Sequence, residues 1–326
     1  MLKVGLIGCG FMGAMHANCY KNIVGVEVVA FSDIRREKAE ELQKGTNAVI
    51  YDNALELINN AKVDVIDICL PTFLHAKYAM LAMEKVKYVF VEKPVALTVE
   101  EGNLMIEKAK ATGAQVQVGQ VIRFWDEYVK LKEILESKTY GSVVNANFRR
   151  ISPRPTWGWE DWLIDFERSG GANQDLHIHD IDYVLSIFGK PLSFYSVKNS
   201  KGEKNSYVNT IMQYDDFVVG VEGTWDLPTT HPFEATFRVC FEKAVVENAG
   251  GKFMLYTDSG ASQIELEKKE LSGGVEGGNI SDLGGYYNEL LYFCERAKAG
   301  ESIQKATLLD AVSSLEFLKK ELAFKG

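Results

Sequence analysis

The chain has 326 residues, of which 46% are hydrophobic, and this is enough to fill two ordinary cores. Its net charge of −9 argues against a nucleic-acid partner, because no basic stripe offsets the acidic balance. The five cysteines include no CxxC pair, which excludes a disulfide framework and a thiolate zinc site and suits a reducing cytoplasm. No segment approaches the roughly 20 apolar residues needed to span a membrane, and we expect no signal peptide. These features predict a soluble, cytoplasmic protein without nucleic-acid or membrane partners.

The first 120 residues alternate between short apolar stretches and helical patterns. Predicted strands cover residues 3–7, 26–31, 63–70, 88–91 and 115–118. Predicted helices cover residues 11–20, 35–44, 74–85 and 99–111, the last of which begins with a capping box of Thr98 and Glu101. Strands that alternate with helices in this way predict parallel pairing in a doubly wound sheet.

After about residue 122 the pattern changes to successive strands. A helix over 128–137 precedes predicted strands at 142–151, 192–198, 206–214, 217–225, 233–241 and 244–247, and helices over 283–299 and 306–323 close the chain. Polar turns between these strands predict an open-faced, mostly antiparallel sheet with helices on one face. We therefore expect two domains, residues 1–121 and 122–326.

A GxGxxG motif lies directly between the first predicted strand and the first predicted helix. In this context Gly8 permits a tight turn, Gly10 lets the backbone approach a pyrophosphate, and Gly13 allows the helix to pack closely on the strand. The beginning of the helix, where Phe11 and Met12 lie, presents N–H groups and a partial positive charge to the phosphates. The motif predicts that the N-terminal domain is a Rossmann domain that binds a dinucleotide.

The end of the second predicted strand indicates which dinucleotide binds. Asp33, followed by Ile34, stands at the position where a carboxylate accepts the ribose 2′-OH and repels a 2′-phosphate, which favours NAD. Asp33 is also a plausible N-cap for the next helix, and the two roles are compatible. Arg35 and Arg36 leave NADP as the less favoured alternative, because a guanidinium can pair with a 2′-phosphate.

The triplet Glu92-Lys93-Pro94 ends the fourth predicted strand. Proline cannot continue a central strand and holds the preceding lysine in an extended conformation. A lysine at the carboxyl end of a parallel strand points into the crevice where open α/β sheets bind ligands. Lys93 is therefore a candidate for contact with substrate, although a surface lysine before a turn is the simpler interpretation of the triplet alone.

Asp175 and His179 lie in the densest polar cluster of the chain, on a predicted helix that ends near Gly189. Because they are four residues apart, they share a face, whereas His177 points to the other side. The three side chains do not converge as zinc ligands would, so we predict no metal site. Taken alone, the pair is better explained as an N-cap aspartate and a packed core histidine.

The GxGxxG motif, the Glu92-Lys93-Pro94 triplet and the pair Asp175 and His179 occur in the order and spacing of one known family. In these motifs the chain resembles the glucose-fructose oxidoreductase/inositol dehydrogenase (Gfo/Idh/MocA) family along nearly its whole length. The resemblance implies a Rossmann domain coupled to an open-faced sheet domain. It also implies that Lys93 contacts substrate and nicotinamide, that Asp175 holds the reacting hydroxyl, that His179 is the general base, and that the Lys93–Pro94 bond is cis.

Further positions that the resemblance assigns to the cofactor follow the predicted strands: Leu70, Pro71, Thr72, His75, Glu92 and Gln120. Arg123 lies where the family's substrate pocket begins. Trp157, Trp159 and Trp162 crowd one loop, and tryptophan stacks on sugar rings; we assign Trp157 and Trp162 to the substrate, although packing against the sheet is the alternative.

The apolar residues of the second sheet predict self-association. Tyr207, Val219, Val221, Phe237 and Val239 alternate along its strands, and we expect them on a face that the helices leave uncovered. Such a face predicts a homodimer or homotetramer built sheet to sheet.

The leading interpretation is an NAD-dependent dehydrogenase that transfers hydride between the nicotinamide and a secondary hydroxyl or keto group of a sugar, cyclitol or sugar derivative. One alternative is a glycoside hydrolase that uses NAD only transiently, as some relatives do. The other is a non-catalytic regulator that senses nucleotide on the same scaffold, because fold alone does not establish activity.

Overall fold

The computed structural model describes residues 1–199, 206–267, 269–275 and 283–325. It divides into two compact units, each of which is discontinuous in sequence. Unit 1 contains Met1–Phe124, Glu167–Ser169 and Glu270–Ser313, and unit 2 contains Trp125–Phe166, Gly170–Lys269 and Ser314–Gly326. The proposed domains, 1–121 and 122–326, are continuous, and they differ from these units chiefly because residues 270–313 pack within unit 1.

Unit 1 is built around a parallel six-stranded sheet with the strand order β3-β2-β1-β4-β5-β6. Its strands are β1 Leu2–Ile7, β2 Val26–Ser32, β3 Val49–Tyr51, β4 Val65–Ile68, β5 Tyr88–Val91 and β6 Gln115–Val118. This is the strand order of the dinucleotide-binding doubly wound fold, so the predicted Rossmann domain is confirmed. Strands β4 and β5 are buried along their whole length, as expected of central parallel strands covered on both faces.

The helices of unit 1 follow the predicted alternation, with two additions, α3 and η1. They are α1 Phe11–Lys21, α2 Arg36–Gln43, α3 Ala54–Asn60, α4 Thr72–Ala82, α5 Val99–Thr112, the short 3₁₀ helix η1 Val121–Phe124 and α9 Gly284–Ala299. The sequence-based prediction omitted β3 and α3. Strand β3 has only three residues, too few for a periodic signal, although Asn53, which accepts from Glu56 N, does mark the start of α3.

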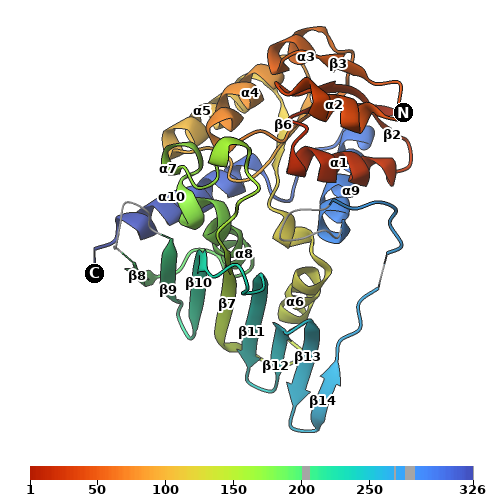
Figure 1. Ribbon diagram of the computed structural model, residues 1–326. Coiled ribbons are helices and arrows are strands. Elements are labelled where there is room, and N and C mark those ends of the chain that lie inside the picture. The colour runs from red at the N-terminus through yellow and green to blue at the C-terminus, as the bar shows by residue number, and fades with distance from the viewer. Residues whose placement is uncertain (200–205, 268, 276–282, 326) are drawn as a thin grey trace. The chain divides into compact units, whose positions relative to one another are not determined.

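Helix α9 shows why the compact units do not follow the order of the chain. It packs against α1, more than 260 residues earlier in the sequence, and the two helices lie side by side in Figure 1. Leu290, Phe293 and Cys294 of α9 are fully buried in the same core as Met15 and Cys19 of α1. An amphipathic helix can complete a core from any position in the chain, and sequence distance alone does not reveal this.

Unit 2 contains a sheet of eight strands in the order β14-β13-β12-β11-β7-β10-β9-β8. Its strands are β7 Val143–Pro153, β8 Ser193–Lys198, β9 Tyr207–Gln213, β10 Val218–Leu227, β11 Glu234–Phe241, β12 Val245–Ala249, β13 Lys252–Thr257 and β14 Gly260–Gln263. Every neighbouring pair is antiparallel except β7 and β10, which are parallel. The mostly antiparallel sheet is confirmed, and β13 and β14 extend it beyond the six predicted strands.

The two faces of this sheet correct one expectation. Val219, Val221, Phe237 and Val239 are at most 2% exposed and are not on an uncovered face. Val221 and Phe237 both pair in register with Phe148, within the buried face of the sheet. Alternation separates the faces of a strand without saying which faces the core, and here the more apolar set of residues faces inward.

The opposite face carries a mixture of aliphatic and charged side chains. Tyr207, the fifth residue of that expectation, has the same phase as Ile211 and belongs to this face. The exposed residues Tyr195, Val197, Ile211 and Val218 continue it across β8, β9 and β10. Arg149 lies on the same face and pairs with Glu222 at 3.3 Å and Glu234 at 3.1 Å.

The helices of unit 2 place its polar cluster. They are α6 Asp126–Ser137, the 3₁₀ helix η2 Trp159–Asp161, the π-helix η3 Asn173–His177 and α8 Ile178–Phe188. The short helix α7, Phe166–Ser169, has only its first residue in unit 2. Helix α10, Leu308–Ala323, begins in unit 1 and ends in unit 2. None of the helices in the described part of the chain is long and apolar enough to cross a membrane.

Candidate active site

The turn from β1 to α1 has the geometry of a phosphate cradle. Gly8 has φ +91°, and a Cβ there would lie 2.4 Å from the Cys69 carbonyl oxygen, so only glycine fits. A Cβ on Gly13 would lie 1.9 Å from the Gly8 carbonyl oxygen, because α1 packs directly on the end of β1. At Gly10, by contrast, a Cβ would meet only the Arg35 guanidinium, at 3.6 Å. The first and third glycines are therefore required for packing, while the second leaves room for a ligand.

The start of α1 is suited to bind an anion. Its N-cap is Gly10, and no side chain caps the helix. Gly10, Phe11 and Met12 are partly exposed, whereas Gly8 and Gly13 are buried. The uncapped N-terminus of a helix presents N–H groups and a partial positive charge at this accessible point. The cradle fits the diphosphate of a dinucleotide.

Asp33, at the end of β2, is held in place by backbone donors. Its Oδ2 accepts from Cys9 N at 2.7 Å, and its Oδ1 accepts from Arg35 N at 2.8 Å. A carboxylate has about four acceptor positions, so capacity for a ribose hydroxyl remains. Ile34 beside it is 68% exposed. Arg36 is turned to other carboxylates, Glu40 at 3.1 Å and Asp52 at 2.5 Å. These residues fit NAD.

The segment after β4 combines exposed and buried residues. Leu70 and Pro71 are partly exposed, whereas Thr72 and His75 of α4 are 1% exposed. The two ring nitrogens of His75 lie 2.7 Å from the Pro94 carbonyl oxygen and 2.6 Å from the Leu70 carbonyl oxygen. Burial lowers the pKa of His75, although both carbonyls act against this. His75 thus ties the loop after β4 to the loop after β5, and its ring is not presented to solvent.

Lys93 is the one accessible residue of a buried segment. In the stretch 88–96, every other residue is buried. The Lys93–Pro94 peptide bond is cis, which confirms what the family resemblance implied. Glu92 is 4% exposed, and its Oε2 accepts from the Lys93 backbone N–H at 3.1 Å. Strand β5, Pro94 and Glu92 are buried, and of this segment only the Lys93 side chain reaches the surface.

The two predicted residues after β6 differ in their surroundings. Gln120 is 2% exposed. Arg123, in η1, has a side chain that is 14% exposed and pairs with Asp310 at 3.2 Å. Asp310 also accepts from Thr307 N, at 3.0 Å, in the turn that precedes α10. Arg123 therefore ties η1 to the start of α10.

In unit 2, Asp175 and His179 repeat the pattern seen at Lys93. They are the only two residues in the stretch 170–184 that are not buried. The local structure differs from the predicted continuous α-helix, because residues Asn173–His177 form a π-helix and α8 begins at Ile178. Such π-turns occur frequently at functional sites. Asp175 therefore lies in the π-turn and His179 in the first turn of α8.

His177 lies on the other side of this element, as its spacing indicates. It is fully buried, with Nε2 3.1 Å from Glu321 Oε1. Its ring packs on β10, where a Cβ at Gly223 would lie 2.6 Å from Nδ1. Arg150, also buried, pairs with Asp180 of α8 at 2.8 Å. These contacts hold the polar segment against the sheet and leave Asp175 and His179 accessible.

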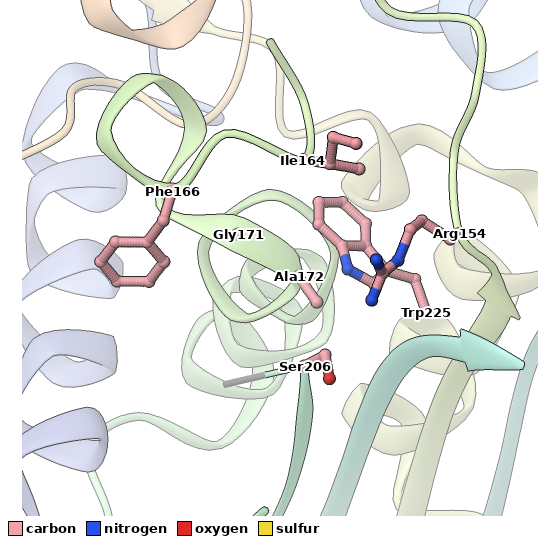
Figure 2. Close-up of a pocket in the computed structure, with 7 residues that line it drawn as sticks. All are labelled: Arg154, Ile164, Phe166, Gly171, Ala172, Ser206 and Trp225. Carbon is pink, nitrogen blue, oxygen red and sulfur yellow. The ribbon is translucent and has the colours of Figure 1, made fainter. Parts of the chain in front are cut away.

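A small cavity lies beside this segment within unit 2. Figure 2 shows that Gly171 and Ala172, just before the π-helix, line it together with Trp225, Arg154 and Ser206. Ile164 and Phe166 also line it. Trp157 and Trp162, which we predicted to contact substrate, are not among its lining residues; Trp157 is 39% exposed and Trp162 is half-buried.

The sequence-based prediction did not include Arg154 or Trp225. Their proximity results from a pairing that the sequence does not reveal: β7 and β10 are parallel, so the ends of the two strands lie at the same edge of the sheet. Arg154 comes directly after β7, Trp225 lies near the end of β10, and Arg154 pairs with Asp226 at 2.9 Å.

Comparison with known proteins identifies the class. Residues 2–120 match the model of the oxidoreductase family with an NAD-binding Rossmann fold, and residues 128–247 match the GFO/IDH/MocA C-terminal domain. The chain belongs to the Gfo/Idh/MocA family of oxidoreductases, and its N-terminal part is an NAD-binding Rossmann fold.

Individual relatives match only part of the chain, at moderate sequence identity. The chain is 31% identical over 193 residues to a myo-inositol 2-dehydrogenase of Thermotoga maritima. This match covers 58% of this chain and 55% of the relative. It is 38% identical over 214 residues to an inositol 2-dehydrogenase of Salmonella paratyphi B, covering 64% and 61%. The matches thus span little more than half the length of these relatives. An Agrobacterium radiobacter oxidoreductase, solved with NAD⁺, L-tartaric acid and magnesium, has the same fold, with a TM-score of 0.85, 18% identity, and coverage of 99% and 96%.

Proposed function

We propose that the protein is an NAD-dependent dehydrogenase that acts on a secondary hydroxyl of a sugar, a cyclitol or a sugar derivative. The observation that carries this proposal is that three side chains are partly exposed within otherwise buried segments. Lys93 is the accessible residue of one buried segment, and Asp175 and His179 are the accessible residues of another. Membership of an oxidoreductase family and the names of the inositol dehydrogenase relatives support the substrate class.

Each of these three residues has a role in the proposed reaction. Oxidation of an alcohol requires loss of the hydroxyl proton together with loss of a hydride from carbon. His179 takes the proton, because the ordinary pKa of histidine lies near neutrality. The Lys93 ammonium stabilises the negative charge that develops on the oxygen, and Asp175 orients the hydroxyl. NAD, when bound, supplies the acceptor for the hydride.

We propose NAD rather than NADP as the cofactor. The Asp33 carboxylate stands where a 2′-phosphate would have to bind, and like charges repel. The Arg36 guanidinium is already paired with two carboxylates. In this proposal Gly10, Phe11 and Met12 hold the diphosphate, Gly8 and Gly13 shape the turn that presents them, and Ile34, Leu70 and Pro71 line the rest of the nucleotide site.

We also propose that the protein is a homodimer or homotetramer that associates through the open face of the second sheet. Tyr195, Val197, Ile211 and Val218 supply exposed apolar area there, and Arg149 supplies a charge. A cytoplasmic location is proposed as well, supported by five cysteines that are all free thiols.

The direct test is a substrate screen. The protein is incubated with NAD and a panel of cyclitols, free sugars, sugar phosphates and glucosides, and the absorbance of the reduced cofactor is followed. The proposal expects turnover with at least one member of the panel and a lower rate with NADP. Release of sugar from a chromogenic glucoside without accumulation of reduced cofactor would instead support the hydrolase alternative, and tight NAD binding without any turnover would support the regulator.

A further inference from the structure

A buried cluster of polar side chains lies beneath Lys93 in unit 1. His16 of α1 is fully buried, and its Nδ1 lies 2.8 Å from Asp67 Oδ2. The other ring nitrogen, Nε2, lies 3.0 Å from Glu92 Oε1. Tyr20 donates to the same Asp67 oxygen at 2.9 Å, and Cys69 Sγ lies 3.2 Å from His16 Nδ1. None of the roles assigned above uses His16.

The arrangement makes His16 an imidazolium. Two carboxylate oxygens flank its ring: Asp67 Oδ2 lies at hydrogen-bond geometry 2.8 Å from Nδ1, and Glu92 Oε1 lies at ion-pair distance, 3.0 Å, from Nε2. Burial is the largest single influence and lowers the pKa of His16, but the contacts with Asp67 and Cys69 together outweigh it, so the pKa lies above its ordinary value. Burial raises the pKa of Tyr20 and of Cys69, which keeps both protonated and uncharged. His16 is therefore the cation between Asp67 and Glu92.

The cluster continues to Lys93 through Glu92. One Glu92 oxygen faces His16, and the other accepts from the Lys93 backbone N–H at 3.1 Å. The carboxylate rests against the backbone of Gly119, where a Cβ would lie 2.9 Å from Glu92 Oε1. Glu92 thus has little freedom to move. An unbroken series of contacts joins Asp67, His16, Glu92 and the backbone of Lys93.

We propose that His16 is a positioning residue for Lys93, acting through Glu92 to fix the lysine backbone in the orientation that the reaction needs. The inference rests on the proposed function, because it assigns His16 a part in the same reaction. Paired charges hold an active-site group more rigidly than apolar packing does, since each contact depends on distance and direction. Misplacement of a reacting group by about 1 Å can lower the rate about 100-fold, so loss of this support has a measurable effect on turnover.

Two substitutions of His16 separate its contacts. The amide nitrogen of asparagine is as many bonds from Cα as Nδ1, so His16→Asn keeps a partner for Asp67 and loses the contact with Glu92. The amide nitrogen of glutamine corresponds to Nε2, so His16→Gln keeps a polar group near Glu92. Tyr20→Phe is the matched control, because it removes a buried polar contact from the far side of Asp67 and leaves Glu92 untouched.

Hydrogen exchange of the Lys93 backbone N–H, measured by NMR on the full chain, reports positioning without any substrate. We expect His16→Asn to speed this exchange about 10-fold or more, with His16→Gln and Tyr20→Phe close to wild type. With a substrate found in the screen, His16→Asn lowers kcat by about 10- to 100-fold and leaves the NAD dissociation constant nearly unchanged. His16→Gln recovers most of that rate.

The proposal is overturned if Lys93 exchange is unchanged in His16→Asn, or if all three variants alter exchange only in proportion to their loss of global stability. Should His16→Asn fail to fold, Gly119→Ala provides the second variant, because its methyl group displaces the Glu92 carboxylate with His16 intact; the same faster Lys93 exchange is expected, and normal exchange counts against the proposal. A wild-type protein that reduces no NAD would refute the proposed function, and the exchange measurement would still decide the role of His16.

Discussion

The segment around Lys93 and the segment around Asp175 and His179 solve the same problem in different ways. Each is a buried stretch that exposes only the side chains suited to chemistry. In unit 1 the accessible residue follows a fully buried strand, and charged groups support it from beneath: His16, Asp67 and Glu92. In unit 2 the accessible residues lie on a π-turn and the first turn of a helix. The His177–Glu321 pair ties this segment to α10, and the Arg150–Asp180 pair ties it to β7.

The difference has a consequence for mutation. Where the supporting contacts reach the backbone of the functional residue itself, as at Lys93, we expect their loss to lower the reaction rate. Where they reach only neighbouring residues on the far side of a helix, as at His177, we expect their loss mainly to lower the free energy of unfolding. The predictions that follow separate these two kinds of support.

The largest effects are expected at the accessible residues themselves. His179→Ala should lower kcat by about 10²- to 10⁴-fold, because it removes the proposed general base, and should leave NAD affinity nearly unchanged. Lys93→Ala should lower kcat and also raise the substrate KM, because an ammonium meets the substrate oxygen in the ground state and the transition state alike. Steady-state kinetics on the best substrate, together with NAD titration, provide both values. Near-normal kcat in either variant would remove that residue from the mechanism.

The next largest effect is on stability. Arg150→Met leaves Asp180 buried without its cation, and we expect a loss of about 3–5 kcal/mol in the free energy of unfolding. Arg149 is the matched control in the adjacent position: its side chain is 46% exposed and pairs with Glu222 and Glu234 on the open face. Arg149→Met should cost at most about 1 kcal/mol. Urea denaturation at one fixed protein concentration measures both, and equal losses would contradict the assigned faces.

His177→Ala tests the inner side of the active-site helix. It leaves the buried Glu321 carboxyl without its imidazole partner, and the expected loss in unfolding free energy is about 1–3 kcal/mol. Turnover should fall far less than in His179→Ala, because His177 faces the sheet. The helical-face argument would be wrong if His177→Ala were folded and inactive while His179→Ala kept its activity.

The smallest effect is a dependence of stability on pH. Because the pKa of His16 is raised in the folded protein, its contribution is fully present below the unfolded-chain pKa of about 6.5 and is lost as pH rises through the folded-state pKa. The difference in unfolding free energy between wild type and His16→Gln should therefore shrink, by up to about 1.4 kcal/mol per pH unit, over that interval. Denaturation at a series of pH values checks this. A difference that stays constant or grows with pH contradicts a charged His16.

Local patterns were enough to predict most of the first unit. Strands alternating with helices, the three glycines and the proline after Lys93 each act within a few residues, so their consequences are visible in the sequence. The short strand β3 gave no periodic signal. The packing of α9 on α1 could not be seen, because the two helices are separated by most of the chain.

The second unit was predicted less completely for a related reason. Alternation at Val219 and Phe237 showed two faces and did not show which one the helices cover. The parallel pairing of β7 with β10, which brings Arg154 and Trp225 to one cavity, depends on long-range topology. The contacts of His16, on α1, were missed because one partner, Asp67, lies on β4 and the other, Glu92, directly follows β5.

The central claim is that the protein moves a hydride from a carbon bearing a hydroxyl group to NAD. The most direct test uses the best substrate of the screen with deuterium on its ring carbons, followed by mass spectrometry of the cofactor. The account predicts reduced cofactor that carries a deuterium with the wild-type protein, and a rate of deuterium transfer that falls in parallel with kcat in Lys93→Ala and His179→Ala at matched NAD occupancy. Bound NAD that never gains deuterium from any member of the panel would contradict it.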